Sequence, residues 1–168
     1  LEQVLSDEVN TEKAFRTIDN LLNRTIKKDY PRDYTLLRNS IITYFKTNTY
    51  IDYDAMVENA INNYQPVEIE SEKMGKFLEK VKELPERHKF DKQFNTVSKV
   101  INARIRKVYD VCKGIQIKIT DAIPDICDTI EAYRDDNGNK YLKIKTDNDT
   151  TYEIFSKEKS RAGIGWVL

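Results

Sequence analysis

The chain has 168 residues, enough for one domain or two small ones, and it is 39% hydrophobic and 33% charged, which is typical of a globular protein and excludes a disordered one. Its net charge is zero, no apolar run approaches the ~20 residues of a membrane-spanning helix, and the polar N-terminal residues contain no signal peptide. Two cysteines and one histidine exclude a disulfide scaffold and a zinc-ligand set.

The first half of the sequence predicts a cluster of about four helices in the region 1–85. Asn10 or Thr11 is the candidate N-cap of a first helix, and Asp33 is the candidate N-cap of a second. Apolar residues follow each cap at intervals of three and four. In the first helix they are Ala14, Phe15, Ile18, Leu21, Leu22 and Ile26, and in the second Leu37, Ile41, Tyr44 and Phe45.

Two more helices are expected before residue 86. Asp52 is the predicted N-cap of the third helix, with Ile51 positioned to pack on Met56 as a hydrophobic staple. Ser71 is the expected cap of an amphipathic fourth helix that ends at Pro85. Four helices joined by short links favour an antiparallel cluster.

After Pro85 the hydrophobic period changes from that of helices to that of strands. Three isoleucines between 115 and 119 alternate with polar residues, which predicts a half-buried strand, and Gly114 before them predicts a turn. The segment from Arg104 to Val111 is the expected partner strand. A helix over 96–109 fits the same residues, and we favour a short helix or irregular segment that gives way to a strand near Arg104.

A second hairpin is predicted at Asn137-Gly138, between the alternating runs 129–133 and 140–145. Thr151–Phe155 is expected to form a last strand. The predicted fold class is therefore α+β, with an N-terminal cluster of about four helices followed by a C-terminal antiparallel β-meander. We expect the helical region 1–85 and the sheet region 86–160 to pack together as one domain. In the tail, 161–168, Trp166 is expected to dock on that domain.

The sequence favours no catalytic site and no cofactor or metal. The only histidine, His88, follows a predicted helix end, and no nucleophile motif or phosphate-binding glycine loop is present. The acidic run at Asp135 lacks the glutamate of a calcium loop, because the twelfth residue is Thr146. Cys112 and Cys127 can pair across adjacent strands, but two buried or half-buried thiols are the favoured interpretation. We therefore expect that the protein is not an enzyme.

Positive charge is concentrated in the middle of the chain. Residues 84–118 contain nine basic and three acidic residues, a net charge of +6, whereas each flank has a net charge of −3. Such a segment is either ordinary surface or a surface for a polyanion. If 104–111 is a strand, Arg104 and Arg106 share one face and Lys107 lies on the other. The candidate DNA-binding residues are Lys99, Arg104, Arg106, Lys107, Lys113 and Lys118.

The order of these segments resembles the nucleoid-associated (NdpA-like) protein family of bacteria, in its C-terminal half. The resemblance covers 12–155 loosely and 105–145 best. The segments that carry it are Tyr44-Phe45, Ile51-Asp52-Tyr53-Asp54, Phe90-Asp91, the basic run before Gly114-Ile115-Gln116-Ile117-Lys118-Ile119, Thr129-Ile130-Glu131-Ala132-Tyr133, Asp136-Asn137-Gly138 and Lys140-Tyr141-Leu142-Lys143-Ile144-Lys145.

This resemblance implies a cytoplasmic location at the nucleoid and association with double-stranded DNA. Two departures limit what is carried over. The chain lacks the N-terminal half of such a protein, consistent with a first residue, Leu1, that is not methionine, and we expect a fragment of a longer protein. The acidic flanks also differ from a simple basic binder.

Two functions follow as expectations. The first is a non-catalytic domain of a nucleoid-associated protein that binds double-stranded DNA weakly and non-specifically, or supports a DNA-binding region outside this chain. The alternative is a protein-interaction or homodimerisation module without nucleic-acid contact, which would use an apolar helix face or an exposed strand edge.

Overall fold

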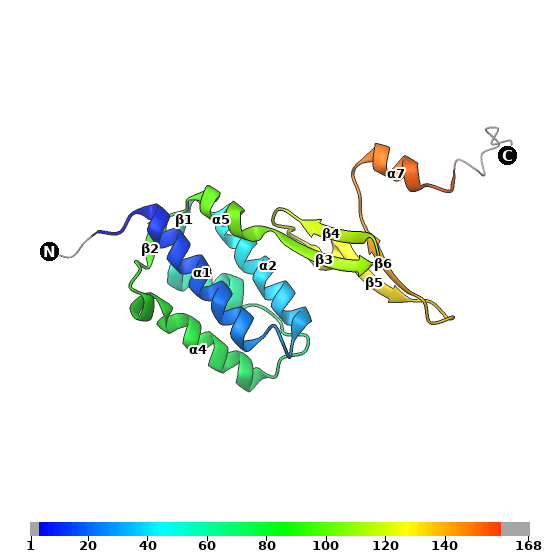
Figure 1. Cartoon of the computed structure of the whole chain (residues 1–168). Helices are drawn as coiled ribbons and strands as arrows, with labels where there is room; N and C mark the ends of the chain where they lie inside the picture. The colour runs from blue at the N-terminus through cyan, green and yellow to red at the C-terminus, as the bar shows by residue number, and fades with distance from the viewer. Residues whose placement is uncertain (1–3, 159–168) are drawn as a thin grey trace. The chain divides into compact units, whose positions relative to one another are not determined.

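The computed structural model describes residues 4–158, and its class is α+β, as predicted (Figure 1). Within these residues the strands form three separate two-stranded antiparallel sheets rather than one continuous meander. The chain divides into two compact units, residues 1–124 and 125–168, whereas the sequence predicted one domain composed of the regions 1–85 and 86–160. Trp166, expected to dock on the domain, lies outside the described residues.

The first unit contains the helical cluster and two of the sheets. Its helices are α1 (Asp7–Thr25), α2 (Pro31–Thr47), α3 (Tyr53–Met56), the π-helix η1 (Val57–Asn62), α4 (Ser71–His88) and α5 (Ser98–Ile105). Its strands are β1 (Tyr50–Asp52), β2 (Gln93–Asn95), β3 (Lys107–Cys112) and β4 (Ile115–Ile119). Strand β1 pairs with β2, and β3 pairs with β4.

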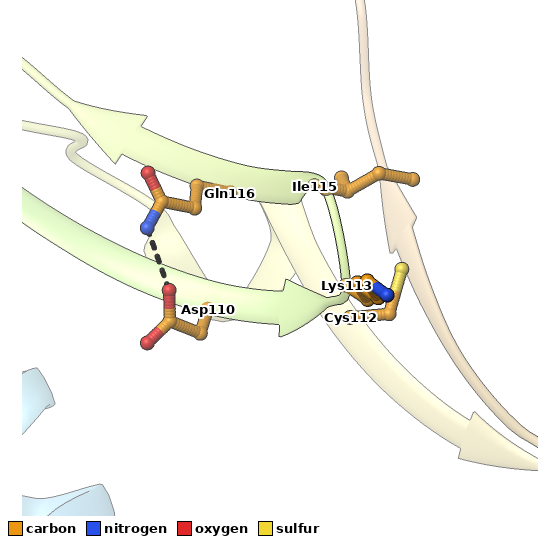
Figure 2. Close-up of a pocket in the computed structure, with 6 residues that line it drawn as sticks. Asp110, Cys112, Lys113, Ile115 and Gln116 are labelled. Atoms are coloured by element: carbon orange, nitrogen blue, oxygen red, sulfur yellow. Dashed lines mark hydrogen bonds between the residues drawn. The ribbon is translucent and has the colours of Figure 1, made fainter.

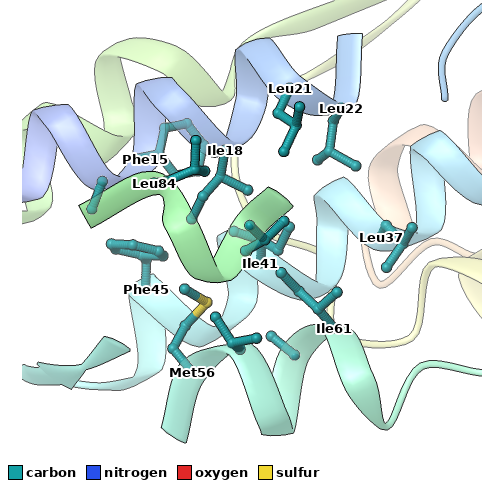
Figure 3. Close-up of a cluster of buried hydrophobic side chains, with 14 of the residues drawn as sticks. Phe15, Ile18, Leu21, Leu22, Leu37, Ile41, Phe45, Met56, Ile61 and Leu84 are labelled. Atoms are coloured by element: carbon teal, nitrogen blue, oxygen red, sulfur yellow. The ribbon is translucent and has the colours of Figure 1, made fainter. Parts of the chain in front are cut away.

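One hydrophobic core lies between the helices of this unit (Figure 3). The apolar face predicted for the first helix is buried throughout, because residues three and four apart share one side of a helix. Phe15 of α1 meets Phe45 of α2 edge to face, with ring centroids 5.7 Å apart. Side chains from α1, α2, α3, η1 and α4 converge on this core, including Ile18, Leu22, Ile41, Met56, Ile61 and Leu84.

The cap predicted for the first helix is wrong. Ser6 caps α1, and its hydroxyl accepts a hydrogen bond from the Val9 amide at 3.2 Å. Asn10 and Thr11 are buried inside the helix instead. The Asn10 amide donates to Asp91, and the Thr11 hydroxyl donates to the Asn95 carbonyl. These two side chains hydrogen-bond α1 to the segment around β2. Such hydrogen bonds allow polar side chains to occupy buried positions.

The cap predicted for the second helix is also wrong, because α2 begins at Pro31 and Asp33 lies in its first turn. Asp33 is fully buried, and its carboxylate accepts four hydrogen bonds. The donors are the Tyr64 hydroxyl and the three consecutive amides of residues 67–69, at 2.8, 2.7 and 2.8 Å. Asp33 therefore fixes the loop between η1 and α4 rather than a helix end.

The fourth helix continues past the residue expected to end it. Pro85 lies inside α4, which runs to His88 and ends where Lys89 adopts a left-handed conformation at φ 53°. Proline has no amide hydrogen, so the carbonyl of Val81 loses its usual partner four residues later. The buried hydroxyl of Tyr53 donates to that carbonyl at 2.8 Å. This replacement explains how the proline is accommodated.

The third helix starts as predicted. The Asp52 carboxylate accepts from the Ala55 amide at 3.1 Å, and both Ile51 and Met56 are fully buried. Of the two alternatives left open before the next strand, a short helix or an irregular segment, the structure has the helix, and β3 begins at Lys107 rather than near Arg104. Gly114, at φ 86°, forms the turn into β4.

The second unit contains α6 (Ile126–Thr129), β5 (Ile130–Arg134), β6 (Lys140–Ile144) and α7 (Asp149–Phe155). The hairpin predicted at Asn137-Gly138 is confirmed, with Gly138 at φ 85°. The last strand, predicted for 151–155, is wrong. Asn148 accepts from the Thr151 amide at 2.8 Å and caps α7, and this local cap outweighs the strand propensity of the residues that follow.

Candidate functional site

The six basic residues predicted to bind DNA do not form one surface. Two of them are paired with glutamates of α1. Lys99 lies 3.5 Å from Glu8, and Arg104 lies 3.4 Å from Glu12. Both pairs come from the packing of α5 beside α1. The positive charge of these two residues is therefore partly neutralised by carboxylates of the same unit.

Two other predicted residues, Lys107 and Lys118, lie in the strand pair β3–β4. Lys107 pairs in register with Ile119, and Val108 pairs with Lys118, so the two lysines lie on opposite faces of the hairpin. Lys107 shares its half-buried inner face with Tyr109. Lys118 lies on the exposed outer face. Arg104 belongs to α5, so the expectation that it shares a strand face with Arg106 does not hold.

Three of the exposed predicted residues lie at the β3–β4 hairpin: Arg106 before β3, Lys113 in the turn and Lys118 on β4. Within residues 4–158, none of the three forms an ion pair. We call them the outer basic set. Side chains alternate between the two faces of a two-stranded sheet, which places Lys118 on the outer face, and the tight turn exposes Lys113. The nearest acidic group along the strand, Asp110, bonds to the side chain of Gln116 at 2.7 Å (Figure 2).

Lys113 borders a shallow depression at the hairpin turn (Figure 2). The side chain of Cys112 also lines this depression, and both Cys112 and Cys127 are exposed free thiols. The prediction of buried or half-buried thiols is therefore wrong. Cys112 ends β3 beside the turn, where no other element covers it in the described part of the chain. None of the residues that line the depression is buried, so it provides no enclosed reaction site.

Two groups considered above as possible chemical sites, His88 and the acidic run at Asp135, occupy ordinary structural positions. His88 is an exposed residue at the end of α4. The carboxylate of Asp135 organises the β5–β6 turn, accepting from the side chain and backbone amide of Asn139 and from the Tyr141 hydroxyl. The hydrogen bonds from Asn139 lower the pKa of Asp135. Among residues 4–158, no three His, Cys, Asp or Glu side chains are grouped closely enough to hold a metal ion.

Sequence reasoning missed a second basic group, which is assembled around Tyr34 of α2. The Lys107 ammonium lies 4.1 Å from the centroid of the Tyr34 ring, and the Lys27 ammonium lies 5.5 Å from it. Arg38 lies one turn along α2 and bonds Asp19 at 2.7 Å. We call Lys27, Arg38 and Lys107 the Tyr34 cation cluster. Lys27 lies in the turn after α1 and Arg38 in α2, but Lys107 comes from β3, 73 residues after Tyr34, so no local pattern indicates the whole cluster.

The second unit has a different surface. None of the described residues from 125 to 158 is buried. On one face of the β5–β6 hairpin, Ile130 pairs with Ile144 and Ala132 pairs with Leu142. Among residues 125–158, seven large apolar side chains are exposed: Tyr133, Tyr141, Leu142, Ile144, Tyr152, Ile154 and Phe155, the last at 79%. A hairpin without a covered face is marginally stable in water.

Comparisons of the chain with family models, with curated proteins and with solved structures found no match. None of the helices in the described part of the chain is long and apolar enough to cross a membrane.

Proposed function

We propose that this chain is a non-catalytic domain that binds double-stranded DNA weakly and without sequence preference, through the outer basic set. The observation that carries the proposal is the presence of three cations along one β-hairpin without a carboxylate partner among the described residues. The resemblance to the nucleoid-associated family supports duplex DNA as the polyanion and the cytoplasmic nucleoid as the location.

The chemistry of the hairpin fits phosphate rather than base contacts. The guanidinium group of Arg106 can donate two parallel hydrogen bonds to a phosphate, and Lys113 and Lys118 provide point charges. Phosphate contacts position a protein on DNA but carry no sequence information directly. Their free energy comes largely from the release of counterions, and three contacts support only weak binding at physiological salt.

The test replaces charge without changing side-chain size greatly. A variant with Arg106→Gln, Lys113→Gln and Lys118→Gln is compared with the native chain in fluorescence-anisotropy titrations of a random-sequence duplex. The matched control carries Lys99→Gln and Arg104→Gln, which remove two cations that the structure pairs with glutamates. We expect the triple variant to lose at least tenfold in affinity and the control to lose less than threefold.

An equal loss of binding free energy per charge removed in the two variants would contradict the assignment to the outer basic set, because the effect would then depend on net charge alone. An unchanged affinity in the triple variant would contradict it as well. The helical content of both variants, followed by circular dichroism, separates these outcomes from a loss of fold.

A second candidate function is self-association through the second unit. The exposed apolar face formed by Ile130, Ala132, Leu142 and Ile144 favours it, because contiguous apolar patches on soluble proteins mark interaction surfaces. The other face of the hairpin pairs the charged residues Glu131 and Lys143, so the apolar face is the one that a second copy would cover. A second copy of the chain is therefore the partner we propose for this surface.

Sedimentation velocity over a range of concentrations tests this candidate. Ile144→Gln removes an apolar side chain from the face, and Lys143→Gln changes the next residue on the opposite face. We expect a concentration-dependent dimer in the native chain that Ile144→Gln weakens more than Lys143→Gln does. A native chain that remains monomeric over a wide range of concentrations would exclude the candidate.

A further inference from the structure

We propose that the Tyr34 cation cluster is a binding site for a phosphoryl anion, separate from the DNA contact of the outer basic set. The proposal is independent of the proposed function, because Lys107 lies on the face of β3 opposite to the face that carries Lys118. The ligand class is a phosphate or phosphate monoester, whose charge is between −1 and −2 near neutral pH.

Tyr34 holds the site in place. Only 4% of this residue is exposed, and its hydroxyl donates to the Asn23 side chain at 3.1 Å. The same hydroxyl accepts from the Lys107 ammonium at 3.0 Å. An ammonium group has three N–H donors, so two donors of Lys107 remain for a ligand. The lysine is therefore fixed in position before any anion arrives.

The cluster has more positive than negative charge. Lys27, Arg38 and Lys107 provide three cations, and Asp19 is the carboxylate that pairs with one of them, Arg38. Arg38 also donates to the Arg104 carbonyl at 2.8 Å, which leaves further N–H groups of the guanidinium. Burial raises the pKa of Tyr34, so its hydroxyl stays neutral and contributes no negative charge.

The electrostatic consequence appears at Lys107. Burial and the positive charges of Arg38 and Lys27 lower the pKa of Lys107 to about 8. A cation held among cations in a half-buried position loses hydration and gains repulsion. A bound dianion would reverse both effects, because it would bring opposite charge to the lysines and accept their free N–H groups. The arrangement is thus better satisfied with an anion than without one.

The first experiment titrates the native chain with inorganic phosphate while nuclear magnetic resonance follows the Tyr34 ring and the lysine Nζ signals. Sodium chloride keeps the ionic strength constant. We expect saturable shifts at Tyr34 and Lys107, and a pKa of Lys107 that rises when phosphate is bound. Shifts that grow linearly without saturation, or that chloride alone reproduces, would overturn the proposal.

Substitutions test which residues form the phosphate site. Lys107→Gln and Lys27→Gln are each expected to weaken phosphate binding at least fivefold, and Lys113→Gln, in the outer basic set, is expected to leave it unchanged. Lys27 is an exposed residue, so Lys27→Gln keeps the test valid if Lys107→Gln perturbs the fold. An equal loss in Lys27→Gln and Lys113→Gln would contradict a defined site.

A short duplex distinguishes the two sources of phosphate. We expect the duplex to shift signals of the β3–β4 turn and leave bound phosphate at Tyr34 in place. Displacement of phosphate from Tyr34 by the duplex would overturn the separation of the two sites. Loss of DNA binding in the triple variant, with phosphate binding retained, would support that separation.

Discussion

At the scale of single residues, Asp33 links a helix to a loop. Its carboxylate is buried, and burial opposes its ionisation, but the hydrogen bonds from Tyr64 and from the amides of residues 67–69 outweigh that effect and lower its pKa. The charged form is therefore the form that the folded state holds. The loop between η1 and α4 depends on it, since three consecutive amides have this one acceptor.

We predict that Asp33→Asn destabilises the chain by about 3 kcal/mol at pH 7, because an amide group cannot accept all of these bonds. The carboxylate has a folded pKa below its unfolded value, so its stabilisation is present above pH ~4 and is lost as pH falls through the folded pKa. Urea unfolding of both proteins from pH 7 to pH 3 should show a difference that shrinks with acidification. A constant difference would contradict this account.

Thr43 differs from Asp33 in its hydrogen bonding. Its hydroxyl is buried and has no hydrogen-bond partner among the described residues. We predict that Thr43→Val leaves the free energy of unfolding unchanged or raises it by up to about 1 kcal/mol, because an unpaired buried hydroxyl is costly. The control is Thr11→Val, which removes an acceptor from the Val97 amide and should destabilise the chain. Thermal unfolding distinguishes the two, and a larger loss in Thr43→Val would be contradictory.

At the scale of elements, α4 and α3 are joined by the bond between Tyr53 and the Val81 carbonyl. Proline at position 85 makes this bond necessary. We predict that Tyr53→Phe costs about 2 kcal/mol when Pro85 is present, because a buried carbonyl is left unpaired. Pro85→Ala introduces a backbone amide at this position that can bond the Val81 carbonyl, and the cost of Tyr53→Phe should then fall. A double-mutant cycle measures this coupling, and additive effects would refute it.

Local patterns in the sequence predicted elements well where the determining residues are neighbours. The spacing of apolar residues predicted the buried face of α1, Asp52 predicted the start of α3, and Asn137-Gly138 predicted the β5–β6 turn. Two of the errors arose from partners that are distant in the sequence. The role of Asp33 depends on residues more than 30 positions away, and Pro85 is accommodated by a hydroxyl 28 residues from Val81.

For the candidate site too, the sequence predicted local features and missed those that depend on distant residues. Positive charge near residues 99–118 is visible in the sequence, but its distribution over two faces depends on the register of β3 and β4. The glutamates that neutralise Lys99 and Arg104 belong to α1, and Lys27 and Arg38 meet Lys107 only in the folded chain. Alternation of apolar and polar residues identifies a strand, but it does not indicate which of the strand's two faces a neighbouring helix covers.

At the scale of the whole molecule, the two units differ in how they are stabilised. The first unit has a hydrophobic core shared by α1, α2 and α4, whereas none of the described residues of the second unit is buried. We predict that amides of β5 and β6 exchange with solvent much faster than core amides of α1 in dilute solution, because their opening requires little loss of buried surface. Equal protection in the two units at low concentration would contradict this difference.

The central claim is that an accessible set of three cations on the β3–β4 hairpin contacts the phosphates of duplex DNA. The salt dependence of binding by the native chain tests it most directly, because the slope of log K against log salt is roughly −0.9 for each phosphate neutralised. We predict a slope of about −2.7 for the native chain, from three such contacts, and a slope near zero for the variant that lacks all three charges. Salt-independent binding by the native chain, or the same slope in both proteins, would contradict the account.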